Sequence, residues 1–206
     1  GAKPIEADGH GFYYSDYNFK GARTYFPDRW PCCSGTLPQV AADYHVLIYF
    51  QDPAGVYVNL YTPSTGRWVS ADGARLALTQ SGDYANEGIV RLELKASRSL
   101  RFAMRLRIPA WSGAGAGSPS IRLNGNPVPL ETRLGFASIE RLWKDGDRVE
   151  LEFPMPLRLM PINAHHPDVV AVMRGPQVLF ALADRPRLSR GQLMGMKRTS
   201  DGFWQA

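Results

Sequence analysis

Apolar and polar residues alternate along most of the chain after residue 52, with the period of a half-buried β-strand. Nine segments of five to nine residues carry this pattern, and residues typical of turns separate them. Such a series of short strands is typical of an antiparallel β-sandwich. The predicted strands are residues 56–61, 74–80, 89–95, 100–108, 120–124, 136–142, 148–153, 169–173 and 177–182.

Three short segments have the composition of tight turns, namely residues 124–127, 144–147 and 174–176. Each contains a glycine beside Asn, Asp or Pro, which favours the backbone of a two-stranded hairpin. We therefore expect each of them to close a hairpin. Residues 112–118 are only Gly, Ala and Ser, and we expect a flexible loop there.

The first fifty residues differ from the rest of the chain. Residues 10–30 are rich in aromatic residues interrupted by Gly and Pro, which suits a hairpin or a packed loop. Residues 36–50 have apolar positions at helical spacing, with Thr36 as a plausible N-cap, and predict the one amphipathic helix of the chain. The expected fold is mostly β: an antiparallel β-sandwich over residues 53–185, preceded by a hairpin and one helix within residues 1–52, with residues 186–206 as a tail or the start of a further β region.

Composition and charge narrow the class of protein. Of the 206 residues 44% are hydrophobic and 21% charged, and no apolar run reaches the ~20 residues of a membrane span, so a membrane protein is not expected. The net charge is +5, but Arg91, Arg105 and Arg122 alternate with apolar residues, as on the solvent face of a sheet. We therefore expect no nucleic-acid partner. The cellular compartment stays open, because two cysteines do not decide it.

The two cysteines of the chain, Cys32 and Cys33, are neighbours and lie just before the predicted helix. Adjacent cysteines are strained as a disulfide, whereas thiols at a helix start have a lowered pKa and favour the thiolate. Thiolates there are suited to bind a soft metal or to act as nucleophiles. Zinc needs about four ligands, so the others would be His or carboxylate or lie outside this chain. The alternative is that both are small buried hydrophobic residues.

The other polar candidates are weaker. His45 is expected to pack along the helix, and the His165-His166 pair would point to opposite sides of an extended chain, so a shared metal is not expected. Carboxylates near the cysteines could act as an acid, a base or a support for a metal ligand, but each is more typical of a local ion pair or a helix acid. They are Asp16, Asp28 and Asp43.

A set of motifs spread from about residue 11 to residue 182 resembles the C-terminal part of glycoside hydrolase family 127, the β-L-arabinofuranosidases and their relatives. The combination is far more specific than any one motif. The motifs are Trp30-Pro31-Cys32-Cys33, Tyr57-Val58-Asn59-Leu60-Tyr61, Leu106-Arg107-Ile108-Pro109-Ala110-Trp111, Leu123-Asn124-Gly125 and Arg174-Gly175-Pro176.

This resemblance implies a longer enzyme with an (α/α)6 barrel followed by β-sandwich modules and a carbohydrate substrate. Residues 1–52 would be the C-terminal end of the barrel, with the hairpin and helix left over from it. Carried over to this chain, Cys32 would be the nucleophile and a zinc ligand, and Cys33 a second ligand. A Glu and a Cys from an earlier part of the barrel would complete the zinc site, and a glutamate there would be the acid/base. The full-length enzyme would thus hold zinc, while the chain alone is expected to lack it.

One departure leaves the sugar open. The arabinofuranosidases commonly continue the cysteine pair with Pro-Pro-Asn, where this chain has Ser34-Gly35-Thr36. A different furanoside or an acid sugar of plant pectin is therefore as good a candidate as L-arabinofuranose. A non-catalytic β-sandwich module that binds carbohydrate or is merely structural is the alternative reading, although the tryptophans fall on separate segments. A thiol redox role is a third reading, weakened because no residues separate the cysteines.

Without the rest of the barrel, the chain alone is expected to be catalytically inactive. Its aromatic N-terminal ~50 residues would need another apolar surface to cover them. We expect them either to fold back on the sandwich or to pack against a second copy of the chain.

Overall fold

The computed structural model describes residues 39, 40, 42–113, 117–179 and 189–205. The chain divides into two compact units, one of residues 46–156 and one of residues 1–45 with 157–206. Strands dominate the described residues, so the predicted mostly β fold is confirmed.

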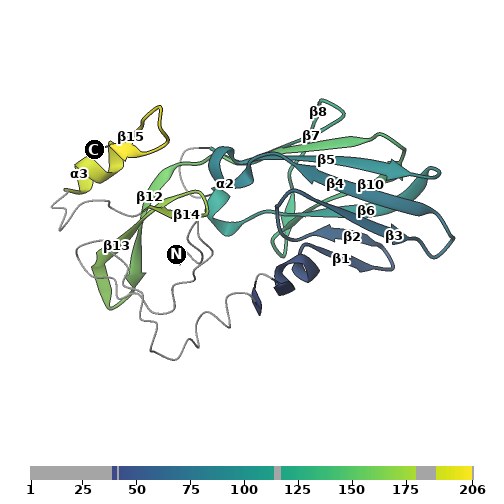
Figure 1. The fold of residues 1–206 in the computed structure, drawn as a ribbon, viewed down its shortest axis with the longest axis horizontal. Coiled ribbons are helices and arrows are strands. Elements are labelled where there is room, and N and C mark those ends of the chain that lie inside the picture. Colours follow the sequence, from purple (N-terminus) through teal and green to yellow (C-terminus); the bar gives the residue numbers. More distant parts are fainter. Residues whose placement is uncertain (1–38, 41, 114–116, 180–188, 206) are drawn as a thin grey trace, which may run out of the picture. The chain divides into compact units, whose positions relative to one another are not determined.

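The first sheet of residues 46–156 has five strands in the order β1-β2-β6-β10-β9 (Figure 1). Neighbouring strands are antiparallel except for β2 and β6, which run parallel and pair Gly55 with Ala103 and Val58 with Leu106. The five strands are β1 (Tyr49–Asp52), β2 (Gly55–Val58), β6 (Leu100–Arg107), β10 (Phe136–Trp143) and β9 (Thr132–Arg133).

The second sheet has six strands, all antiparallel to their neighbours, in the order β3-β4-β5-β11-β7-β8. Its central strands alternate buried and exposed residues, as the sequence predicts for strands with one face on a core. The six strands are β3 (Ser64–Val69), β4 (Arg75–Ser81), β5 (Ile89–Ala96), β11 (Arg148–Glu152), β7 (Ser120–Leu123) and β8 (Asn126–Val128).

Apolar side chains from both sheets form one core, which makes these sheets a sandwich. Trp143 is fully buried at its centre, stacks on Phe102 with ring centroids 5.6 Å apart, and donates its indole N–H to the Phe102 carbonyl at 3.0 Å. A buried indole with a satisfied N–H adds a large apolar surface without a polar penalty. Other fully buried members are Val58, Leu78, Leu92, Leu94, Met104, Leu106, Leu151 and Phe153.

The predicted helix over residues 36–50 is too long. Residues 39, 40, 42 and 43 are helical, the chain tightens into the 3-10 turn η1 (Tyr44–Leu47), and strand β1 begins at Tyr49. The Tyr49 ring lies against the backbone of Gly66 on β3, and its hydroxyl is 3.1 Å from Ser64 Oγ. Packing between two sheets therefore overrides the helical spacing of the local sequence. The predicted hairpin of residues 10–30 lies outside the described residues.

The prediction of a single helix also misses two short ones, α2 (Tyr84–Glu87) and α3 (Arg190–Met194). The Asp83 side chain caps α2 by accepting from Asn86 N at 3.0 Å. Ser189 and Gln192 form a capping box at the start of α3. Both helices are too short for an apolar periodicity to show in the sequence. A second 3-10 turn, η2 (Ala110–Gly113), extends into the predicted loop of residues 112–118.

Two of the three predicted hairpins are confirmed. Asn124 and Gly125, at φ 50° and 82°, connect β7 to β8, and Arg174 pairs with Gln177 across the third turn. The prediction for residues 144–147 is wrong, because β10 and β11 belong to different sheets. This turn carries the chain from one layer of the sandwich to the other, and the local residues are the same as those of a hairpin.

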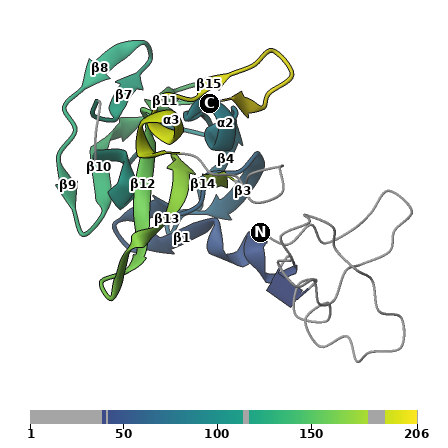
Figure 2. The ribbon, with the colours of Figure 1, turned by 90° about the vertical axis from the view of Figure 1, so that its left-hand side faces the viewer.

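The second unit contains a three-stranded antiparallel sheet in the order β12-β13-β14 (Figure 2). Residues 189–205, within the predicted tail, add α3 and a two-stranded ribbon. The Arg174 guanidinium on β13 lies 5.4 Å from the centre of the Trp204 ring on this ribbon. These strands are β12 (Leu157–Asn163), β13 (His166–Arg174), β14 (Gln177–Leu179), β15 (Lys197–Arg198) and β16 (Trp204–Gln205).

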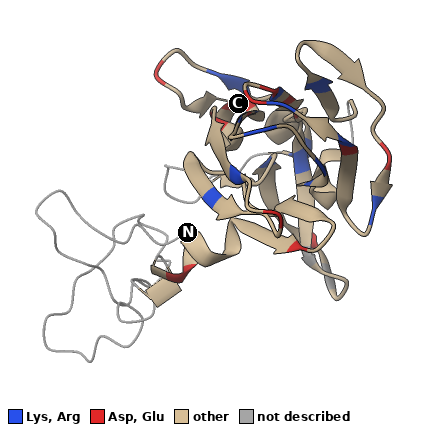
Figure 3. Cartoon of the chain, turned by 90° about the vertical axis from the view of Figure 1, so that its right-hand side faces the viewer, with Lys and Arg blue, Asp and Glu red and all other residues tan. Residues whose placement is uncertain are grey.

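Charged residues are spread over several strands. Figure 3 shows Lys and Arg interspersed with Asp and Glu. On the outer face of the six-stranded sheet, Arg91 pairs with Glu150 at 3.0 Å and Arg148 with Glu93 at 3.3 Å. The predicted solvent face of alternating charges is therefore present on this sheet. Among the described residues, no helix has the length and apolar character that crossing a membrane requires.

Candidate functional site

The predicted site residues Cys32 and Cys33 lie outside the described residues, as do Asp16 and Asp28. Their predicted roles as nucleophile and zinc ligands therefore remain predictions. Within the part of the chain that the structure describes, no three His, Cys, Asp or Glu side chains come together in a way that could hold a metal. His45 is exposed instead of packed, with Nδ1 2.5 Å from the Ala42 carbonyl oxygen.

A polar cluster ties the β1–β2 turn to β6. Asp52 accepts hydrogen bonds from the Ala54 and Gly55 amides at 2.8 and 2.9 Å and from the Tyr57 hydroxyl at 2.8 Å. Arg105 lies 3.3 Å from Asp52 and 4.6 Å from the centre of the Tyr57 ring. The Tyr57 hydroxyl, together with the backbone amides and Arg105, holds the pKa of Asp52 below its usual value, and the same hydrogen bond raises the pKa of Tyr57.

A second cluster fixes the start of the sandwich. Asn59 donates its side-chain amide to the Leu47 carbonyl at 2.9 Å and accepts from Arg107 Nη2 at 2.6 Å. The Arg107 guanidinium also lies 4.4 Å from the centre of the Phe136 ring. An arginine held by both an amide and an aromatic face is strongly oriented. Asn59 thus pins the chain at the point where it enters the five-stranded sheet.

Aromatic rings pack at one end of the sandwich. Tyr61 donates its hydroxyl to the Arg107 carbonyl at 2.7 Å, and burial raises its pKa well above the usual value. The rings of Tyr84, Trp111 and Phe153 contact one another with centroids 5.6 to 6.3 Å apart. These contacts are those of a packed core margin, and the Tyr61 phenol stays protonated.

A cavity of about 510 Å³ opens at another place, between β1, β3 and the start of β6. The half-buried Trp68 and the buried Leu76 and Phe102 give it an apolar floor. Exposed polar side chains surround this floor, and we refer to the whole as the Trp68 groove. They are Gln51, Asp52, Asp72 and Arg101.

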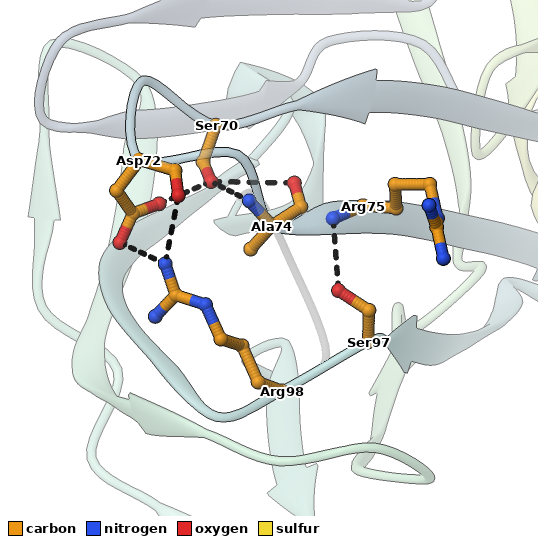
Figure 4. Close-up of polar contacts among 6 residues, drawn as sticks. All are labelled: Ser70, Asp72, Ala74, Arg75, Ser97 and Arg98. Carbon is orange, nitrogen blue, oxygen red and sulfur yellow. Dashed lines mark hydrogen bonds and ion pairs between the residues drawn. The ribbon is translucent and has the colours of Figure 1, made fainter.

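The β3–β4 turn forms one wall of the Trp68 groove and is tied down by side chains (Figure 4). Ser70 bonds to Asp72 Oδ1 at 2.5 Å and accepts from the Ala74 amide at 2.9 Å, while Arg98 bonds to the Asp72 carbonyl at 3.1 Å and to its carboxylate. The hydrogen bond from the Ser70 hydroxyl is the main cause, and the Arg98 hydrogen bond the next, that holds the pKa of Asp72 below its usual value. The wall is therefore held in place before anything binds.

The comparisons with known proteins decide the family of this sandwich. Residues 55–155 match the family model for the middle domain of the β-L-arabinofuranosidases of glycoside hydrolase family 127 (GH127). The sandwich is a GH127 middle domain. The resemblance noted from the motifs is thereby confirmed. No curated protein sequence matches the chain significantly.

Solved structures agree with the GH127 assignment. A GH127 β-L-arabinofuranosidase from Geobacillus stearothermophilus T6 is 28% identical, with a TM-score of 0.69 over 85% of this chain and 30% of its own. A structure described as a glycoside hydrolase is 34% identical, with a TM-score of 0.63 over 76% of this chain and 26% of its own. A GH127 β-arabinofuranosidase is 31% identical, with a TM-score of 0.63, and the match covers 72% of this chain and 26% of that structure's chain. The chain thus spans less than a third of each of these structures.

The family motifs inside the GH127 middle domain have structural roles. Tyr57, Asn59 and Tyr61 of one motif bond to Asp52, Leu47 and the Arg107 carbonyl. Asn124 of the Leu123-Asn124-Gly125 motif bonds to Asp147 at 2.8 Å and supports the turn between the two sheets. The sequence indicated that these motifs matter but not what they do, because their partners lie 5 to 46 residues away in the chain.

Proposed function

We propose that this chain is part of a glycoside hydrolase that cleaves β-L-arabinofuranosides or a related sugar of plant polysaccharides, with Cys32 as its nucleophile. The observation that carries the proposal is the match of residues 55–155 to the GH127 middle domain, together with the Cys32-Cys33 pair directly upstream. The similar solved structures, one named a β-L-arabinofuranosidase and one a β-arabinofuranosidase, support the substrate class.

Cys32 acts by covalent catalysis. Its thiolate Sγ forms a bond to the anomeric carbon as the glycosidic carbon–oxygen bond breaks, and the departing oxygen takes a proton from a carboxylic acid elsewhere in the protein. Water, deprotonated by that same carboxylate, then displaces Sγ. Two displacements at one carbon return the original configuration, so the enzyme is retaining.

Cys32 and Cys33 suit zinc as donors, because thiolates are preferred zinc ligands. They supply two of about four ligands. Among the described residues, no group of three or more His, Cys, Asp or Glu side chains could hold a metal ion. By the family resemblance, the other two, a Glu and a Cys, would come from an earlier part of the barrel. Bound zinc would keep a thiol deprotonated at neutral pH.

The sandwich holds the point at which the chain enters it. Asn59 and Arg107 hold the Leu47 carbonyl at the edge of the five-stranded sheet. Residues 33–47 connect Cys33 to this anchor in the sequence. Because the acid and two zinc ligands would come from elsewhere, the chain alone is expected to be inactive.

The experiment uses the full-length protein and an aryl β-L-arabinofuranoside, with aryl glycosides of other furanoses and of acid sugars in parallel. Cys32→Ser should lower kcat by about three orders of magnitude or more, because an alkoxide is far harder to form than a thiolate. Ser34→Ala, two residues away, is the matched control and should retain activity. Near-native turnover by Cys32→Ser would refute the nucleophile, and activity only on an acid sugar would refute the arabinofuranoside.

A further inference from the structure

We propose that the Trp68 groove binds one sugar residue of an oligosaccharide, as a binding site in the sandwich separate from the cysteine chemistry. The inference does not depend on Cys32, since binding is measured without turnover. The groove joins an indole, an apolar floor and a rim of hydroxyl-binding side chains in one cavity.

The floor of the groove provides the aromatic surface. Trp68 lies on β3, the edge strand of its sheet, and packs partly against the core while it also lines the cavity. Among the described residues its indole N–H has no hydrogen-bond partner. The face of an indole carries negative partial charge, which attracts the C–H groups on one face of a sugar ring. Trp68 therefore offers both a stacking surface and a free donor.

The rim provides partners for hydroxyl groups. Gln51 has an amide that both donates and accepts, the two carboxylates Asp52 and Asp72 accept, and Arg101 donates. A cavity of about 510 Å³ lies within the roughly 300–1,000 Å³ of small-molecule sites. This combination fits a ligand with an apolar ring face and several hydroxyls around its edge.

The charge of the rim adds a cationic contact to the groove. Asp52 and Asp72 are each paired with an arginine, Arg105 at 3.3 Å and Arg98 respectively. These pairs leave the rim close to neutral, with Arg101 as an additional cation. Arg101 is therefore the one charged rim side chain outside these pairs among the described residues, and it can donate to a hydroxyl or to a carboxylate of a sugar.

The groove is formed before binding. Its walls come from the β1–β2 turn, the β3–β4 turn and the start of β6, which meet at one end of the sandwich. Backbone amides that donate to the Asp52 carboxylate and to the Ser70 hydroxyl hold the first two. Loops held by a rigid scaffold are common sites of recognition, and little ordering is needed when the ligand arrives.

The test titrates the 206-residue chain with linear arabinotriose, xylotriose and galactotriose, and with trigalacturonic acid as the acidic probe. Binding is followed by calorimetry and by the NMR resonances of the Trp68 indole N–H and the Gln51 side-chain amide. We expect at least one of these probes to bind and to shift both resonances.

Variants separate stacking from general effects on the fold. Trp68→Ala should weaken binding about tenfold or more, Trp68→Phe should weaken it less, and Gln51→Ala should weaken it without changing the denaturation midpoint. Leu134→Ala, which shortens a side chain that is 89% exposed and does not line the groove, is the control and should bind normally.

Two outcomes would overturn the proposal. They are no binding of any probe at about 10 mM, and binding that Trp68→Phe and Gln51→Ala leave unchanged. Loss of turnover in a Cys32 variant leaves this test untouched, so failure of the two proposals can be told apart.

Discussion

Arg107 at the end of β6 and Asn59 directly after β2 meet beside the parallel pair of strands, with Arg107 Nη2 2.6 Å from Asn59 Oδ1. The same Asn59 side chain donates to the Leu47 carbonyl at 2.9 Å. One amide therefore joins three segments that lie up to sixty residues apart in the chain. This asparagine is the structural reason for a polar residue in the middle of the Tyr57–Tyr61 motif.

Replacing Asn59 tests this anchor. Asn59→Ala removes both bonds and leaves a half-buried guanidinium with a missing acceptor, so we expect a loss of about 1–2 kcal/mol in the free energy of unfolding. Urea denaturation of the chain measures it. Asn126→Ala is the matched control, because its side chain makes only a weak exposed bond at 3.4 Å, and it should change little. Equal stability of the two variants would contradict the anchor.

Gly55 tests the parallel pairing of β2 with β6. A Cβ at this glycine would lie 1.9 Å from the Ala103 carbonyl oxygen, so the two strands would have to separate. We expect Gly55→Ala to cost about 2–4 kcal/mol in the free energy of unfolding. Gly113→Ala is the control, because no atom lies within 4 Å of its added Cβ. A denaturation midpoint of Gly55→Ala equal to that of the control would contradict this close approach.

The Asp52–Tyr57 hydrogen bond predicts a pH dependence. The pKa of Asp52 is lower in the folded chain than its ordinary 3.8, because Tyr57 and the turn amides bond to the carboxylate. The stabilisation is therefore present above about pH 3.8 and is lost as the pH falls through the lower folded pKa. Tyr57→Phe should flatten this acid limb in a plot of denaturation midpoint against pH. An unchanged acid limb in that variant would show that the bond does not govern Asp52.

The sequence predicts most strands of the sandwich because apolar and polar residues alternate regularly along them. Strands β4, β5, β10 and β11 follow the predicted segments to within two residues at each end. Strand β3 was missed, since the edge segment Ser64–Val69 is mostly polar and half-exposed. Strand β12 was also missed, because prolines at 154, 156 and 161 interrupt its pattern.

The two candidate sites differ in whether the sequence alone can reveal them. The cysteine pair could be singled out from sequence because both residues are adjacent in a motif, and it remains a prediction. The Trp68 groove could not, because Gln51, Trp68 and Phe102 are separated in the chain and meet only through the order of the strands. In the same way, the residues of the turn 144–147 cannot reveal that it joins two sheets.

Zinc analysis tests the shared metal site. Since the chain provides only two cysteines, we expect the 206-residue chain to bind zinc weakly and to lose it on dialysis. The full-length protein should hold about one zinc per chain, and Cys33→Ser should release it. Elemental analysis by mass spectrometry measures both. Dialysis-resistant, stoichiometric zinc on the 206-residue chain would show that this chain carries further ligands.

The segment that leads into β1 predicts self-association of the 206-residue chain. Val46, Leu47 and Phe50 follow one another closely and are 56%, 46% and 45% exposed. Clustered exposed apolar residues favour an interface, either with another part of a longer protein or with a second copy. We expect the chain to form dimers or larger species in light scattering at micromolar concentration, and the full-length protein to do so less.

The double variant Val46→Asp, Phe50→Asp should shift the chain toward the monomer. Leu134→Asp is the control, since this leucine is 89% exposed in a separate turn and should leave association unchanged. A strict monomer at all concentrations would refute this use of the segment, and equal effects of both variants would assign association to general solubility.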